Sequence, residues 1–134
     1  MDFLAPHASR VLSLLRVIAG LMFVQHGTQK IFGFPQAANG LFELMSQMGV
    51  GGVLELVGGM LIVVGLFTRP VAFVLSGMMA VAYFQFHAGS SLYPLVNGGE
   101  LAALYCFVFL YLSFAGPGAW ALDTMPKGRR RRSR

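Results

Sequence analysis

The sequence predicts an all-α integral membrane protein, an up-down bundle of four transmembrane helices with the N and C termini in the cytoplasm. Three observations predict this fold. Of the 134 residues, 56% are hydrophobic and only 11% are charged, whereas a soluble domain carries roughly 25% charged residues. The apolar residues gather in long blocks, each with about the 17–25 residues that a helix needs to cross hydrocarbon. These blocks lack the regular apolar–polar alternation of a transmembrane barrel.

The predicted spans cover residues 11–32, 51–67, 71–87 and 99–115 of a single membrane domain, residues 1–123. The first block is interrupted by Arg16 and is followed by no small-x-small cleavage site, so we interpret it as a retained span and not as a signal peptide. Residues 124–134 form a basic tail. We expect this tail to lie in the cytoplasm and to be attracted to anionic lipid, although a basic run can also bind nucleic acid or act as a localisation signal.

The basic residues predict the orientation. Arg10, Arg69 and the tail precede the first span, join the second to the third, and follow the fourth, so all three segments share one side. The positive-inside rule assigns that side to the cytoplasm. The opposite connections, residues 33–50 and 88–98, contain no Lys or Arg. Arg16 is expected to extend its side chain back to the cytoplasmic surface.

The first span becomes polar where it ends. His26 and Lys30 are four residues apart, so they share one helix face, and Gly33 then ends the helix. In the following loop, residues 35–50, apolar side chains recur at helical spacing. This pattern predicts a short interfacial helix with Glu43 facing water.

The second span, residues 51–67, carries five glycines and a single charge, Glu55. At 100° per residue, the glycines form two columns with Glu55 between them: Gly51, Gly58 and Gly65 in one, Gly52 and Gly59 in the other. Small residues let another helix approach closely. These faces can serve a homodimer or be used within one bundle. An acid inside such a contact must be paired, hydrated or protonated, which makes Glu55 a functional candidate.

The third and fourth spans add polar groups at the same height. A very short turn at residues 68–70 makes the second and third spans an antiparallel hairpin. Tyr83 and His87 belong to a polar stripe near the end of the third span. In the fourth, Asn97 is the predicted N-cap, and Glu100 lies in the first turn, where a negative charge suits the helix dipole.

These span ends predict one polar layer on the non-cytoplasmic side. The catalytic candidates are Glu55, His26 and His87, and the substrate-binding candidates are Lys30, Tyr83, Asn97 and Glu100. An ion pair of Lys30 with Glu55 or with Glu100 is the expected compensation for the buried charge.

Simpler interpretations stay open for several of these residues. His26 and Lys30 can form an interfacial helix end with Lys30 reaching the headgroups, Glu100 can be only a helix cap, and His87 can be only an interfacial residue. The two histidines and two carboxylates match no metal-binding spacing, so no metal is predicted. The single Cys106 excludes an intrachain disulfide and a C-x-x-C redox pair.

The same residues resemble the DoxX family of small four-helix bacterial membrane proteins. The matching segments are Gly20-Leu21-x-Phe23-x-x-His26-Gly27-x-x-Lys30-x-Phe32-Gly33, Leu54-Glu55-Leu56-x-Gly58-Gly59, Gly65-Leu66-x-Thr68-Arg69, His87, Asn97-Gly98-Gly99-Glu100 through Tyr105, and Gly116-Pro117-Gly118-x-Trp120-x-Leu122-Asp123. The resemblance covers nearly the whole chain in order. It implies a multi-pass protein of the bacterial plasma (inner) membrane, in a family often described as candidate oxidoreductases. The family name is shared with a subunit of a thiosulfate:quinone oxidoreductase.

The expected function is therefore that of a redox-associated membrane subunit that holds a quinone or a similar small apolar molecule in a polar pocket. In this hypothesis Glu55 exchanges a proton with His26 or His87 as its partner, and Lys30 stabilises an anionic form. Tyr83 and Asn97 orient a carbonyl oxygen. The alternative is a non-catalytic scaffold or a small-solute transporter. The expected partners are the lipid bilayer, redox proteins and a second copy of the chain, without nucleic acid.

Overall fold

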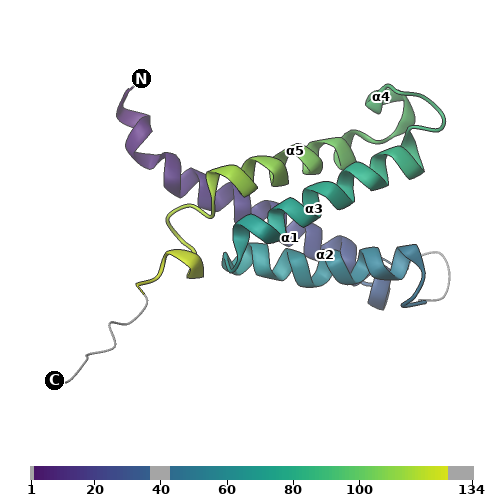
Figure 1. The fold of residues 1–134 in the computed structure, drawn as a ribbon, viewed down its shortest axis with the longest axis horizontal. Coiled ribbons are helices and arrows are strands. Elements are labelled where there is room, and N and C mark those ends of the chain that lie inside the picture. The colour runs from purple at the N-terminus through teal and green to yellow at the C-terminus, as the bar shows by residue number, and fades with distance from the viewer. Residues whose placement is uncertain (1, 37–42, 127–134) are drawn as a thin grey trace.

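The computed structural model describes residues 2–36 and 43–126, and this part of the chain is helical and contains no strand. Figure 1 shows the arrangement of the elements. In chain order they are a 3₁₀ helix η1 (Asp2–His7), α1 (Ala8–Phe32), α2 (Gln47–Val64), α3 (Thr68–Ala82), a π-helix η2 (Tyr83–His87), α4 (Pro94–Asn97), α5 (Glu100–Ala115) and a 3₁₀ helix η3 (Leu122–Thr124).

The four long helices pack as two pairs. α1 lies along α2, and α3 lies along α5, while α2 and α3 are joined by a short turn at residues 65–67. We call the end of the bundle with the connections 33–46 and 88–99 the loop end. The opposite end, which holds η1, the α2–α3 turn and η3, is the terminal end (Figure 1).

Three helical segments are long and apolar enough to cross a membrane: Phe3–Phe32, Gln47–Val64 and Thr68–His87. α5 is apolar but shorter, with 16 residues. The predicted all-helical fold with membrane-spanning helices is therefore confirmed for the described residues. The third of these segments, Thr68–His87, consists of α3 and the π-helix η2, which follow each other without a break.

The second helix begins and ends earlier than the sequence predicts, at Gln47 and Val64 instead of residues 51 and 67. Its N-cap is Ser46, whose side chain accepts a hydrogen bond from Gly49 N at 3.0 Å. Gly65 ends the helix with a left-handed φ of 69°. The predicted interfacial helix lies partly on residues 37–42, outside the described residues. Its described remainder is a turn at residues 43–46, followed by the first turn of α2, so no separate helix exists there.

Gly52, Gly58 and Gly59 of α2 are used for contacts with the neighbouring helices. A Cβ added to Gly59 would lie 3.1 Å from the Gly20 carbonyl oxygen on α1, and a Cβ on Gly27 would lie 2.5 Å from Leu56 N. Gly58, in the other column, faces Leu75 of α3 instead. Close backbone approach between α1 and α2 therefore depends on glycines of both helices.

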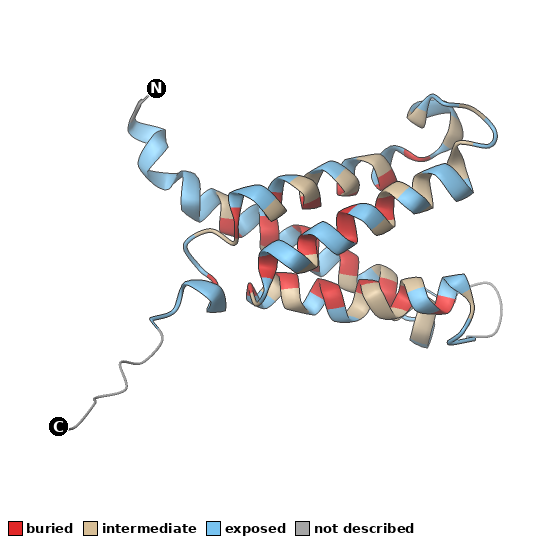
Figure 2. Cartoon of the chain, viewed as in Figure 1, coloured by how far each residue is buried: buried red, intermediate tan, exposed pale blue. Residues whose placement is uncertain are grey.

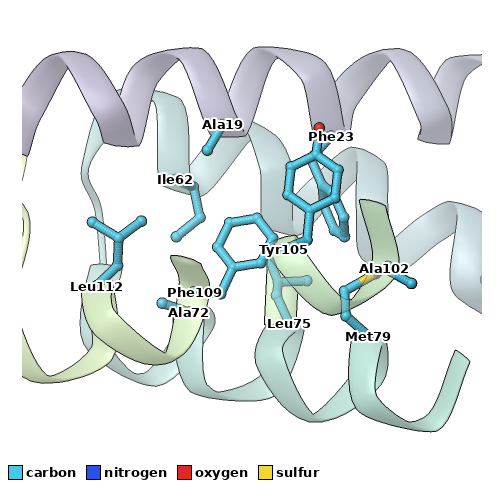
Figure 3. Packing of buried hydrophobic residues seen from close by; sticks show 10 residues of the cluster. All are labelled: Ala19, Phe23, Ile62, Ala72, Leu75, Met79, Ala102, Tyr105, Phe109 and Leu112. Atoms are coloured by element: carbon cyan, nitrogen blue, oxygen red, sulfur yellow. The ribbon is translucent and has the colours of Figure 1, made fainter. Parts of the chain in front are cut away.

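The core lies between the two helix pairs. Phe23 of α1 meets Tyr105 and Phe109 of α5 edge-on, with ring centroids 5.1 and 4.8 Å apart. Ile62 and Leu75 complete this buried cluster from α2 and α3 (Figure 3). Buried residues follow the inward faces of the helices, and the outward faces are exposed (Figure 2). Many of these outward side chains are large and apolar. Such a surface is typical of helices that face the lipid of a membrane.

Arg16 does not extend to the surface, so that expectation was wrong. Its side chain is completely buried. Nε donates to Pro117 O at 2.8 Å, one terminal nitrogen donates to the carbonyls of Ile62 and Val63, and the other donates to Trp120 O. The segment after α5 folds back across the terminal end and brings its carbonyls to the guanidinium. Arg16 thus joins α1, the end of α2 and the C-terminal segment.

Asp123 fixes the same segment to the start of α3. Its carboxylate accepts hydrogen bonds from Phe67 N at 2.9 Å and Thr68 N at 2.8 Å. Burial acts to raise the pKa of Asp123, but these N–H groups and the charge of Arg16 more than offset it, so the pKa is lowered. The C-terminal segment is therefore an integral part of the fold as far as Asp123. Most of the basic tail that follows lies outside the described residues.

Candidate functional site

A cavity of about 340 Å³ lies at the loop end, between all four long helices. It has polar residues on several sides and apolar residues between them. Its lining comprises Phe23, His26, Lys30, Met48, Glu55, Met79, Ala82, Phe86, His87, Gly98, Leu101 and Ala102. Four of the seven candidates from the sequence, His26, Lys30, Glu55 and His87, thus share one cavity.

Lys30 and Glu55 form an ion pair across the α1–α2 contact. Lys30 Nζ lies 2.5 Å from Glu55 Oε1. The two helices approach closely here because Gly27 and Gly52 have no side chain: a Cβ on Gly52 would lie 3.0 Å from Lys30 Cβ. Of the two predicted pairings of Lys30, the one with Glu55 is confirmed, and Glu100 is exposed without an ion pair in the described part of the chain.

The second carboxylate oxygen of Glu55 has no partner among the described residues. Glu55 is only 5% exposed, and its Oε2 is buried without a hydrogen bond from any described residue. A buried carboxylate oxygen is costly when nothing donates to it. The position therefore suits a donor from outside the chain, either water or a ligand that enters the cavity.

The two histidines reach the cavity from different elements. His26 lies on α1, half-buried, with its ring perpendicular to Tyr105 at a centroid distance of 6.3 Å. His87 ends the π-helix η2, in which Ala88 N donates to Tyr83 O at 2.9 Å. His87 Nδ1 lies 3.2 Å from Asn97 O. Short π-helical segments occur frequently at functional sites, and this one carries a cavity-lining histidine.

Tyr83 and Asn97 brace the connection between η2 and α5 and do not line the cavity. Tyr83 OH donates to Leu92 O at 2.9 Å, and Asn97 Nδ2 donates to Tyr83 OH at 3.1 Å and to Ser91 O at 2.7 Å. Asn97 is not the N-cap of α5. It ends the short helix α4, and its Oδ1 accepts from Gly99 N, the residue that occupies the N-cap position. A one-turn helix before α5 moves the cap by two residues.

Glu100 lies in the first turn of α5, as the sequence predicts. Its side chain is exposed and is absent from the cavity lining. The simpler interpretation of Glu100 as a residue that complements the helix dipole accounts for this position.

Tyr105 is a residue near the site that the sequence analysis did not select. It is 4% exposed, and its hydroxyl has no hydrogen-bond partner among the described residues. Its ring packs on Phe23 and His26, both of which line the cavity, and its oxygen points toward α1 (Figure 3). Its sequence signals are a phenolic hydroxyl in a largely apolar block and its place at the end of the matching segment Asn97 to Tyr105.

No group of three or more His, Cys, Asp or Glu residues that could hold a metal ion occurs within residues 2–36 and 43–126. Cys106 is a free, half-buried thiol, with Sγ 3.7 Å from Ser76 Oγ. The cavity-lining groups that could act on a bound molecule are therefore the ion pair and the two histidines.

Fold and site together define a small polytopic membrane protein with a polar cavity at one end. The chain belongs to the DoxX family, whose model matches residues 11–88. It is 44% identical to an uncharacterized protein of Haemophilus influenzae over 92% of this chain and 96% of that protein.

Two further relatives carry descriptive names. The inner membrane protein YqjF of Escherichia coli is 30% identical, over 82% of this chain and 87% of its own. A Bacillus subtilis protein named "Putative oxidoreductase CatD" is also 30% identical, over 82% of both chains. No solved structure matches the chain. Family, relatives and apolar helices together identify a multi-pass protein of the bacterial inner membrane.

Proposed function

We propose that the protein is a redox-associated membrane subunit that binds a quinone, or a similar small apolar molecule, in the cavity at the loop end. The observation that carries this proposal is the convergence of the Lys30–Glu55 ion pair, His26 and His87 on one cavity of about 340 Å³. Small-molecule sites are mostly apolar cavities of roughly 300–1,000 Å³ with a few polar groups that fix orientation. The name of the Bacillus subtilis relative supports the redox class.

The lining fits a flat molecule with carbonyl or hydroxyl oxygens. Phe23, Met79 and Leu101 provide apolar walls, and Lys30 provides a cation that can donate to a carbonyl oxygen. The buried Oε2 of Glu55 has no partner among the described residues, so it can accept a hydrogen bond from a hydroxyl. The site therefore matches both an acceptor-bearing and a donor-bearing form of such a ligand.

A quinone would supply the two-electron, two-proton chemistry of the site. Lys30 would stabilise negative charge on its oxygen, and Glu55 would exchange a proton with it, with His26 or His87 as the second proton carrier. Tyr83 and Asn97 would act indirectly, because they hold the connection whose Asn97 carbonyl faces His87. Since Cys106 has no partner thiol in this chain, electrons would have to pass to or from a redox partner protein.

The proposal includes the topology predicted from the sequence. α5 would be the fourth span of a membrane domain at residues 1–123, since it packs along α3. The termini and the tail at 124–134 would lie in the cytoplasm, which places the loop end on the opposite side. Alkaline phosphatase fused after residue 126 should then be inactive, whereas an active fusion would reverse the topology. Any homo-oligomer would have to use surfaces other than the glycines that contact α1 and α3.

The direct test is mass spectrometry of small molecules extracted from the purified, detergent-solubilised protein, with metal analysis on the same sample. We expect a stoichiometric quinone in the wild type and none in Glu55→Gln. Glu43→Gln is the matched control, because Glu43 is exposed and outside the cavity, and it should retain the molecule. A wild-type protein that is intact and empty, and that takes up no added quinone, would contradict the proposal.

A non-catalytic scaffold or a small-solute transporter is the second candidate, favoured by the way the Lys30–Glu55 pair connects α1 to α2. In this case the pair holds the bundle together or conducts a solute. Glu55→Gln separates the two functions. A purely structural pair predicts loss of folded protein and a folded wild type that binds no quinone, whereas a catalytic carboxylate predicts that the fraction of the variant that inserts and assembles has no activity.

A further inference from the structure

A second, narrower cavity leads from the ion pair toward the outside of the bundle. This crevice, of about 80 Å³, lies between α2 and α3. Lys30, Met48, Glu55, Ala82 and Phe86 line both the crevice and the main cavity. The ion pair is therefore accessible from two directions: from the loop end, and laterally between α2 and α3. α2 and α3 diverge from their turn toward the loop end (Figure 1), where the crevice lies.

The walls of the crevice show that it opens sideways. Gln47, Val81 and Gln85 line it and are exposed on the outer face of the bundle. Gly51 lies in its wall, and a Cβ added there would have no atom within 4 Å. Above it, the side-chain amide of Gln47 donates to that of Gln85 and joins α2 to η2. The Gln47–Gln85 hydrogen bond thus closes the crevice on the loop-end side, whereas at Gly51 the crevice is open to the outside of the bundle.

Below the crevice, the same two helices form an apolar groove. It has a volume of about 330 Å³. The groove is lined by Val53, Leu54, Val57, Gly58, Leu61, Pro70, Val71, Val74 and Leu75. Val53 and Leu54 lie two and three residues after Gly51 on α2, and Val74 lies one turn before Met78 of the crevice on α3. A path therefore runs from the buried ion pair, through the crevice, to an apolar groove between the same two membrane-spanning helices.

We propose that the ligand of the site is an amphiphile, with a polar head in the main cavity and a hydrocarbon tail that leaves through the crevice into the α2–α3 groove. This inference rests on the proposed function, and it specifies the class of ligand. The two volumes support the division: about 340 Å³ suits a ring-bearing head, and about 80 Å³ suits a narrow chain. A soluble ligand would need neither the lateral opening nor the groove.

Blocking the crevice should affect only ligands that have a tail. The bilayer is as apolar as the groove, so the tail gains little by moving between them. A large side chain in the crevice would instead force the bound tail out of its path. We therefore compare decylubiquinone with the same benzoquinone head lacking the decyl chain, each binding to the protein in nanodiscs. Gly51→Phe fills the crevice, and Gly77→Phe on the outer face of α3 is the matched control, because Gly77 also faces open space.

Gly51→Phe should weaken binding of decylubiquinone by about tenfold or more and leave the tail-free head within about twofold. Gly77→Phe should change neither. If Gly51→Phe weakens both probes equally, or neither, the lateral path is overturned while the head site survives. If the wild type binds neither probe, the proposed function fails and this inference fails with it.

A second readout does not depend on affinity. A quinone with a photoreactive diazirine at the end of its tail should label peptides of α2 and α3 that contain the groove residues. Labelling spread evenly over the outward faces of α1, α2, α3 and α5 would indicate an annular lipid position and would overturn the proposal.

Discussion

The ammonium group of Lys30 lies 2.5 Å from the Glu55 carboxylate, where Gly27 of α1 and Gly52 of α2 let the two helices approach closely. This contact connects α1 to α2, and the second carboxylate oxygen of Glu55 has no partner within residues 2–36 and 43–126. The same two residues therefore bear on the stability of the bundle and on the proposed binding of a ligand. Variants at this pair should separate the two.

Lys30→Met should destabilise the protein by roughly 3–5 kcal/mol, because it leaves the buried Glu55 without its counter-ion. The double variant Lys30→Met with Glu55→Met should regain most of this loss, since two packed apolar side chains replace the ion pair. The fraction of each purified variant that stays monodisperse after heating measures the loss in Lys30→Met and its recovery in the double variant. Arg10→Met, at an exposed position, is the control. A double variant no more stable than Lys30→Met would contradict this explanation.

Arg16→Met should cost about 3 kcal/mol or more, because four carbonyl oxygens at the terminal end each lose a hydrogen bond from the buried guanidinium. Arg69→Met is the matched control. Arg69 donates to the carbonyls of Ser113 and Phe114 but is exposed, so its loss should cost about 1 kcal/mol or less. Thermal unfolding in one detergent compares them. Equal losses would show that the burial of Arg16 has no special weight.

Asp123 should make the stability of the folded protein depend on pH in the acid range. Its pKa in the folded protein is lowered, so its contribution is present above the unfolded pKa of 3.8 and is lost as the pH falls through the folded pKa. Asp123→Asn should lower the unfolding temperature at pH 7, and its difference from the wild type should shrink below pH 3.8. Melting curves between neutral pH and pH 3 test this. A difference that is constant with pH would exclude a charge effect.

Two buried hydroxyls should respond differently to removal. Tyr105→Phe should leave the unfolding temperature unchanged or raise it, because the hydroxyl has no partner among the described residues. Ser76→Ala should cost about 1 kcal/mol, since Ser76 Oγ donates to Cys106 O at 2.8 Å. A clear loss of stability in Tyr105→Phe would reveal a partner for this hydroxyl.

Gly27→Ala should destabilise the α1–α2 contact by about 1–3 kcal/mol, because the new Cβ would lie 2.5 Å from a backbone nitrogen of α2. Gly77→Ala should be neutral or stabilising by roughly 0.5–1 kcal/mol, since its Cβ meets open space within a helix. Both are measured by thermal unfolding at the same detergent concentration. An equal effect of the two substitutions would argue against close glycine packing.

The sequence by itself determined the membrane class, the helical content and the height of the polar groups. Hydropathy gives the depth of a residue in a span, and helical periodicity gives its face, so His26, Lys30, Glu55 and His87 could be predicted to converge. The cost of a buried charge predicted an ion pair of Lys30 with either Glu55 or Glu100, and the structure has the pair with Glu55.

Only the tertiary structure decided which residues from distant parts of the chain are in contact with one another. Arg16 is buried because a segment 101 residues away folds back and supplies a carbonyl, and no local pattern encodes that return. Tyr83 and Asn97 bond each other because a one-turn helix precedes α5. The lateral crevice exists because α2 and α3 diverge from their turn. Depth and face are local properties of a helix, whereas the rotation and angle of one helix against another depend on packing between distant residues.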